Sequence, residues 1–144
     1  MSQPESATDL LPLPIPDGRI ERIVLICIRR MAAHGIRDAH AAWLALDCFG
    51  VHFRRPLVLL RAFLLELAQN SQRSIRIAPC CAMRMTEDEG RIIAALRLAG
   101  SDMEAAEEAL VVLSRNPCVG EPLSAAAVFS RAVEEIGAKL SVQG

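Results

Sequence analysis

The most apolar stretch of the chain constrains its fold more than any other feature. Residues 57–68 read LVLLRAFLLELA, and only Arg61 and Glu66 interrupt the apolar run. A membrane-spanning helix needs about 20 consecutive apolar residues, so we expect this shorter stretch to be buried within protein. Its leucines recur at spacings of three and four, which is typical of one buried helix face. The stripe consists of Leu57, Leu60, Leu64 and Leu67.

Further apolar residues extend the hydrophobic surface around the same helix. Val58, Phe63 and Leu65 lie outside the leucine stripe. A helix that is apolar on several sides either stands at the centre of a bundle or faces a second subunit. The sequence therefore predicts a central or interface helix over residues 56–70.

Five other helices are predicted from apolar periodicity and from capping residues. Thr86 with Glu89 matches a capping box, in which two side chains bond the first free amides of a helix. Ser101 with Glu104 repeats the pattern. We expect the five helices to begin near Asp17, Asp38, Thr86, Ser101 and Pro122. The predicted fold is all-α, a single irregular bundle of five or six helices around the central apolar helix.

The length and the first residues define the expected domain organisation. A chain of 144 residues that is 52% hydrophobic has the size and core of one domain. We predict a flexible or loosely docked N-terminal arm over residues 1–15 and one helical domain over residues 16–144. Residues 1–16 read MSQPESATDLLPLPIP. This stretch has acids and prolines where a signal peptide needs a basic segment and an apolar run.

The balance of charge and aromatic residues disfavours two classes of partner. The chain has 16 Lys and Arg against 17 Asp and Glu, a formal net charge of -1. No global field would hold such a protein to nucleic acid or to an anionic membrane. Aromatic residues make up 3% of the chain and none is Tyr, so few stacking platforms exist for single-stranded nucleic acid. We expect no nucleic-acid partner and no membrane partner.

Arginines are concentrated in the middle of the chain. Residues 54–85 hold six arginines and one acid, Glu66, whereas ten acids face five bases from Thr86 onward. Two interpretations stay open: the arginines form an interaction surface, or the acidic second half of the chain neutralises them. The candidate surface residues are Arg54, Arg55, Arg73, Arg76 and Arg84.

Residues 71–85, here named the connector, are expected to be extended and carry two adjacent cysteines. These two cysteines form the candidate thiol or metal site. Thiolates bind zinc or iron, and Arg76 and Arg84 lie near Cys80 and Cys81 in the sequence. A metal site here would recruit Cys118. However, zinc knuckles use cysteines two to four residues apart, and neighbouring cysteines chelate poorly. The alternative is that the pair are small buried or half-buried packing residues that hold no cofactor.

Three segments of the chain resemble a known family. They read AAHGIRDAHAAW, FRRPLVLLRAFLLELAQ and IRIAPCCAMRMTEDE. Over about residues 31–98 the chain resembles a family of short uncharacterised alphaproteobacterial proteins, a domain of unknown function. The resemblance implies no activity, cofactor or site.

The sequence favours a protein that is not an enzyme. It has no nucleophile elbow, phosphate-binding glycine loop or HExxH stretch. We therefore predict a non-enzymatic interaction or regulatory protein, with a homodimer as its simplest assembly. The alternative is a thiol or metal-binding protein centred on Cys80 and Cys81. Five irregularly spaced cysteines fit a reducing cytoplasm better than secretion.

Overall fold

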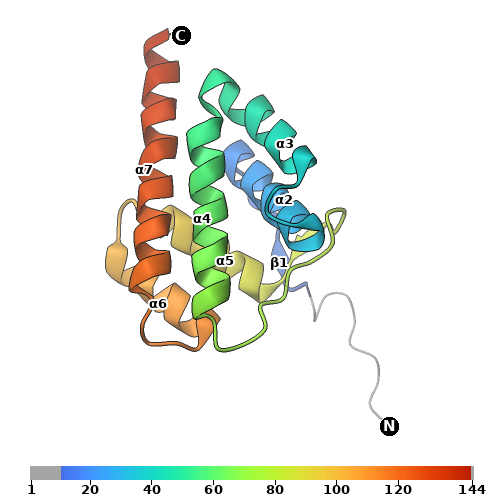
Figure 1. The fold of residues 1–144 in the computed structure, drawn as a ribbon, viewed down its shortest axis with the longest axis vertical. Helices are drawn as coiled ribbons and strands as arrows, with labels where there is room; N and C mark the ends of the chain where they lie inside the picture. The colour runs from blue at the N-terminus through green and yellow to red at the C-terminus, as the bar shows by residue number, and fades with distance from the viewer. Residues whose placement is uncertain (1–10, 144) are drawn as a thin grey trace.

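Six α-helices dominate the fold of the described chain (Figure 1). The computed structural model describes residues 11–143, with side chains through residue 137. The helices are α2 (Arg19–His34), α3 (Ala39–Phe49), α4 (Arg54–Asn70), α5 (Glu87–Leu98), α6 (Met103–Ser114) and α7 (Gly120–Gln143). A 3-10 turn, η1 (Gly50–His52), joins α3 to α4, and two short strands, β1 (Leu13–Pro14) and β2 (Arg84–Met85), complete the structure. The predicted all-α class is confirmed.

The helices pack as three neighbouring pairs: α4 with α7, α2 with α3, and α5 with α6. In Figure 1, α4 and α7 lie side by side and run in opposite directions, and α5 crosses behind them. An ion pair of 3.1 Å joins Arg55 at the start of α4 to Glu135 late in α7. Helices α2 and α3 form one hairpin, and α5 and α6 form another. None of the helices in residues 11–143 combines the length and the hydropathy that a bilayer-spanning segment requires.

Helix α4 supplies much of the core, as its apolar sequence predicts. Leu60, Phe63 and Leu67 are buried in the main hydrophobic cluster. Leu57 joins a smaller cluster near the start of α4. Leu64, expected on the buried stripe, is only partly buried because Phe63 turns fully inward. The buried face of α4 is thus rotated from the predicted leucine stripe.

Two of the predicted helix starts use the expected residues. The Thr86 side chain accepts a hydrogen bond from the Glu89 amide at 3.0 Å, and the Glu89 carboxylate accepts one from the Thr86 amide at 2.9 Å. This is the predicted capping box at α5. At α3, the Asp38 carboxylate accepts a hydrogen bond from the Ala41 amide at 2.9 Å. Both caps satisfy amides that the helix itself leaves free.

Two other predicted caps are wrong. Helix α6 is capped by Asp102, which accepts a hydrogen bond from the Ala105 amide. Ser101 is not the cap, because the turn that closes α5 runs through both Ser101 and Asp102, whose amides bond the Leu98 carbonyl, and α6 begins only at Met103. Helix α2 follows Gly18 in an extended conformation without a side-chain cap, so the helix does not begin on an Asp17 cap.

Residues 11–17, here named the strap, cross α5. β1 pairs antiparallel with β2, with Leu13 opposite Met85. The Arg84 guanidinium reinforces this contact by donating hydrogen bonds to the Leu11 and Pro12 carbonyls at 2.9 and 2.6 Å. Residues 1–10 of the predicted arm lie outside the described residues. The sequence analysis did not predict the strand pair, because two residues per strand give no periodic signal.

Candidate interaction surface

A buried ion pair holds the connector that carries the adjacent cysteines. The Arg29 guanidinium donates to both Glu89 carboxylate oxygens at 2.7 and 3.0 Å, and the two side chains are 1% and 0% exposed. The same guanidinium donates to the Ala82 and Arg84 carbonyls at 2.8 and 2.9 Å. Glu89 also accepts a bond from the Ala78 amide at 3.3 Å. The buried ion pair therefore fixes both flanks of the cysteine turn, with Glu89 holding Ala78 and Arg29 holding Ala82 and Arg84.

A second carboxylate of α5 holds the earlier part of the connector. The Asp88 carboxylate accepts hydrogen bonds from the Arg73 guanidinium at 2.9 Å and from the Arg76 amide at 2.8 Å. Burial alone would raise the pKa of Asp88, but these two donors outweigh burial and lower it. Asp88 is therefore an anchor for the connector.

The cysteine pair lies at the centre of a surface turn. The Ala82 amide donates to the Pro79 carbonyl at 3.1 Å, which closes a turn around Cys80 and Cys81. Cys80 is half-buried and Cys81 is exposed. The Asp38 carboxylate, and to a smaller extent Cys80, raises the pKa of the neighbouring Arg30 guanidinium.

The structure does not bring the three candidate metal ligands together. Cys118 lies exposed in the loop between α6 and α7, where its amide donates to the Asn116 side chain at 2.9 Å. Within residues 11–143, no three or more His, Cys, Asp or Glu side chains are grouped so that they could hold a metal ion. Cys80, Cys81 and Cys118 therefore form no such group.

The five candidate arginines lie in different parts of the fold. Arg54 and Arg55 open the 17-residue helix, whereas Arg73, Arg76 and Arg84 follow its end. At about 1.5 Å per residue, α4 separates Arg54 from Arg73, which lies just after the end of the helix, by about 25 Å. Three of the five, Arg55, Arg73 and Arg84, bind groups of the same chain. The structure therefore divides the arginines and uses several of them internally.

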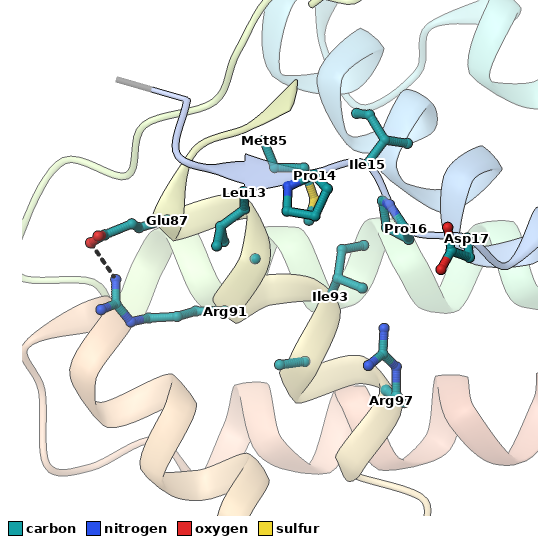
Figure 2. A pocket seen from close by; sticks show the side chains of 12 residues that line it. Leu13, Pro14, Ile15, Pro16, Asp17, Met85, Glu87, Arg91, Ile93 and Arg97 are labelled. Atoms are coloured by element: carbon teal, nitrogen blue, oxygen red, sulfur yellow. Dashed lines mark ion pairs between the residues drawn. The ribbon is translucent and has the colours of Figure 1, made fainter. Parts of the chain in front are cut away.

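A cavity lies between the strap and α5 (Figure 2). Its volume is about 590 Å³. Figure 2 shows the strap from Leu13 to Asp17 along one side and α5 along the other. The arginines at its rim are paired: Arg91 lies 3.7 Å from Glu87, and Arg97 binds the carboxylate of Glu21, with a shortest contact of 2.8 Å. The cavity has apolar walls and its arginines are already paired, which is typical of a contact that packs the strap against α5.

The outward face of α4 carries an apolar stripe. Val58 is 57% exposed, Leu65 is 42% exposed, and Ala62 between them is also exposed. These three residues, here named the outer stripe, are four and three residues apart and share one helix face. In Figure 1, α4 runs along the front of the molecule and no other element is drawn over it. The sequence signalled this stripe through the apolar residues outside the leucine face.

An apolar groove lies beside the outer stripe. It has a volume of about 220 Å³ and is formed by α2, α4, α5 and the connector. Its lining residues are Ile28, Met31, Ala32, Ile36, Leu64, Leu65, Leu67, Ala68, Ile75, Ile77 and Ile92. No charged residue lines it. We name this cavity the α4 groove; the sequence analysis missed it because it joins segments that are distant in sequence.

Arg61 stands one turn before the groove on α4. Leu64, Leu65 and Ala68 follow it at the spacings that place residues on one helix face. The Nε atom of Arg61 is buried and has no hydrogen-bond partner among the described residues. Leaving a buried donor unpaired costs about 1–3 kcal/mol, so this arginine is a feature that calls for a functional explanation.

These features define a small all-α bundle protein with an exposed apolar helix face and an adjoining groove. The chain belongs to the family of unknown function DUF6628, whose pattern matches residues 1–141. This match confirms the resemblance to a domain of unknown function. No curated protein and no solved structure matches the chain.

Proposed function

We propose that this protein is a non-enzymatic interaction module that pairs with a second copy of itself through the outer stripe. The observation that carries the proposal is the exposure of Val58 and Leu65 on one face of α4. Large apolar side chains that share one exposed helix face favour association, because covering them removes apolar area from water.

The order of residues along the outer stripe suits a two-fold contact. Ala62 is small and stands between Val58 and Leu65. If two α4 helices cross antiparallel at Ala62, Val58 of one copy packs against Leu65 of the other, and the reverse contact repeats it. A two-fold interface requires this kind of self-complementary surface. A small central residue also allows two helices to approach closely.

The test is the mass of the protein in solution as a function of concentration. Sedimentation or light scattering should show a species of twice 15.7 kDa. Replacing Ala62 with Glu should reduce the mass to that of one chain, because the symmetry axis places the two new carboxylates side by side. Circular dichroism should remain that of a helical protein.

A matched control separates the interface from a general effect of charge. Ala33 is also exposed but lies on α2, so Ala33→Glu should leave the assembly intact. A single-chain mass for the unmodified protein at every concentration up to the millimolar range would reject self-association. Equal loss of assembly in both variants would reject the outer stripe as the contact.

A thiol or metal function is the second candidate. The observation in its favour is the surface turn at Cys80 and Cys81, whose flanks are held by the buried ion pair of Arg29 and Glu89. Both residues are free cysteines, and Cys81 is exposed. Two thiols on a fixed turn present a ready pair to a thiophilic reagent. We also propose the reducing cytoplasm as the location in which these thiols persist.

Elemental analysis with a free-thiol count tests the second candidate. Near-stoichiometric zinc or iron in untagged protein, lost in the Cys80→Ser, Cys81→Ser double variant, would support a metal site. Five titratable thiols after unfolding and no metal would contradict it. The double variant should keep the helicity of the parent protein, because neither side chain belongs to the buried core.

A further inference from the structure

We infer that the α4 groove binds an amphipathic helix of a partner protein, and that an acidic residue of this helix pairs with Arg61. The inference rests on the proposed role as an interaction module, but it does not require self-association. The groove and the outer stripe are distinct surfaces that share only Leu65.

The size and lining of the groove favour side chains of a helix over a small molecule. Pockets for drug-sized ligands have about 300–1,000 Å³, whereas this groove has about 220 Å³. Its walls are aliphatic side chains and Met31, without a hydrogen-bonding group to orient a small molecule. An amphipathic helix fills such a groove with apolar residues spaced at i, i+4 and i+7.

The charges around the groove favour an acidic partner. No acidic side chain lines it. Arg61, on the same face of α4, has a buried Nε without a partner. Arg37 follows the lining residue Ile36, is exposed and forms no ion pair within the described residues. Arg61 as a residue is only partly buried, so a partner carboxylate would pair with the terminal nitrogens of its guanidinium through a charge-assisted hydrogen bond, whereas the buried Nε stays out of reach.

Arg61 differs in this respect from most arginines near the core. Arg29 and Arg73 each bind a carboxylate and at least one backbone carbonyl. The chain thus pairs its buried guanidinium groups where they serve the fold. The missing partner of Arg61 is supplied, in our proposal, by another protein.

A pair of synthetic peptides tests the inference. The first is a fluorescein-labelled helical peptide of about 16 residues with leucines at i, i+4 and i+7 and flanking glutamates. The second has lysines in place of the glutamates. Fluorescence anisotropy should show binding of the glutamate peptide, weakened by added salt. The lysine peptide should bind at least about tenfold more weakly.

Variants of α4 link binding to the proposed contacts. Arg61→Glu should lower the affinity for the glutamate peptide by about tenfold or more and raise the affinity for the lysine peptide. Arg54→Glu is the matched control, because Arg54 is exposed at the far end of the same helix. Ala68→Trp should fill the groove and lower the affinity for both peptides. Ala62→Glu, which tests self-association, should leave the affinity of the glutamate peptide within a few fold.

Methionine methyl signals locate the bound peptide. Met31 lines the groove, whereas Met103 lies on α6 and is absent from its lining. In spectra of protein with ¹³C-labelled methionine methyls, the glutamate peptide should shift Met31 and leave Met103 unchanged.

Three results would overturn the inference. They are absence of binding by the glutamate peptide, equal affinities for the two peptides, and binding that does not shift Met31. In the Ala62→Glu variant, which does not pair through the outer stripe, a Met31 signal that changes with protein concentration in the absence of peptide would show that a second copy occupies the groove, and would also overturn the inference. If the unmodified protein does not self-associate but still binds the glutamate peptide, the proposed dimer is rejected and the inference about the α4 groove stands.

Discussion

Replacing Arg29 with Met tests the structural basis of the connector. Arg29 is buried and makes four hydrogen bonds, two to Glu89 and two to backbone carbonyls. Removing one partner of a buried ion pair typically costs about 3–5 kcal/mol, because the other charge stays buried without compensation. Domains of this size are stable by about 5–15 kcal/mol. We therefore expect Arg29→Met to remove at least about a fifth of the free energy of unfolding.

Urea unfolding followed by circular dichroism measures this loss. The midpoint should fall and the slope should stay unchanged, since the variant exposes the same surface on unfolding. For a chain of this length, the melting temperature should fall by about 10 °C. A second variant, Arg29→Met with Glu89→Gln, should be more stable than Arg29→Met alone, because it removes the uncompensated charge and keeps an acceptor for the Thr86 amide.

An exposed ion pair serves as the control. Arg97 binds Glu21 at 2.8 Å, but the two side chains are 57% and 35% exposed. Arg97→Met should cost less than about 1 kcal/mol. If Arg29→Met costs no more than Arg97→Met, burial of the ion pair does not stabilise the connector and the reasoning is refuted.

Three further predictions concern a carboxyl pair, two glycines and a buried thiol. Glu121 raises the pKa of Glu66 above its ordinary value of 4.5, first through a shared hydrogen bond and then with burial and repulsion. The stabilising protonated form is lost as pH rises through the raised pKa, so Glu66→Gln should raise the melting temperature at pH 7 but not at about pH 4. Gly137→Ala should stabilise by about 0.5–1 kcal/mol, because a new Cβ there meets no atom of the described residues within 4 Å. Gly90→Ala should raise the melting temperature less than Gly137→Ala, because its Cβ displaces the terminal methyl of Leu13, and melting curves compare the two. Burial raises the pKa of Cys27 to about 12, so mass spectrometry after alkylation at pH 8 should find Cys27 unmodified in folded protein; rapid labelling would contradict this.

Elements fixed by local chemistry were predictable from the sequence. Thr86 and Glu89 form the expected capping box because both partners lie within one helical turn. The start of α6 shows the limit of this reasoning. Ser101 and Asp102 both suit a cap, and the length of the turn that closes α5, whose last bond runs from the Asp102 amide to the Leu98 carbonyl, places Asp102 at the cap position.

Contacts between distant segments were not predictable in the same way. Arg29 and Glu89 are 60 residues apart, and the sequence places each on a helix without indicating that they meet. The α4 groove likewise depends on how α2, the connector and α4 approach one another. The apolar residues of α4 outside the leucine stripe did indicate a surplus face, but the rotation that buries Phe63 and exposes Leu65 follows from packing.

The two polar interruptions of the most apolar segment carry the two buried polar side-chain atoms that lack partners in the described chain, Arg61 Nε and Glu66 Oε2. A helix selected only for burial would favour apolar residues at both positions, because each orphan atom costs free energy. Glu66 faces the Glu121 carboxyl, which raises its pKa, whereas the buried Nε of Arg61 has no partner within the described chain. The position adjoining an apolar groove therefore keeps a charge that the fold does not use. Such a residue is better explained by a carboxylate from another protein than by the stability of this one.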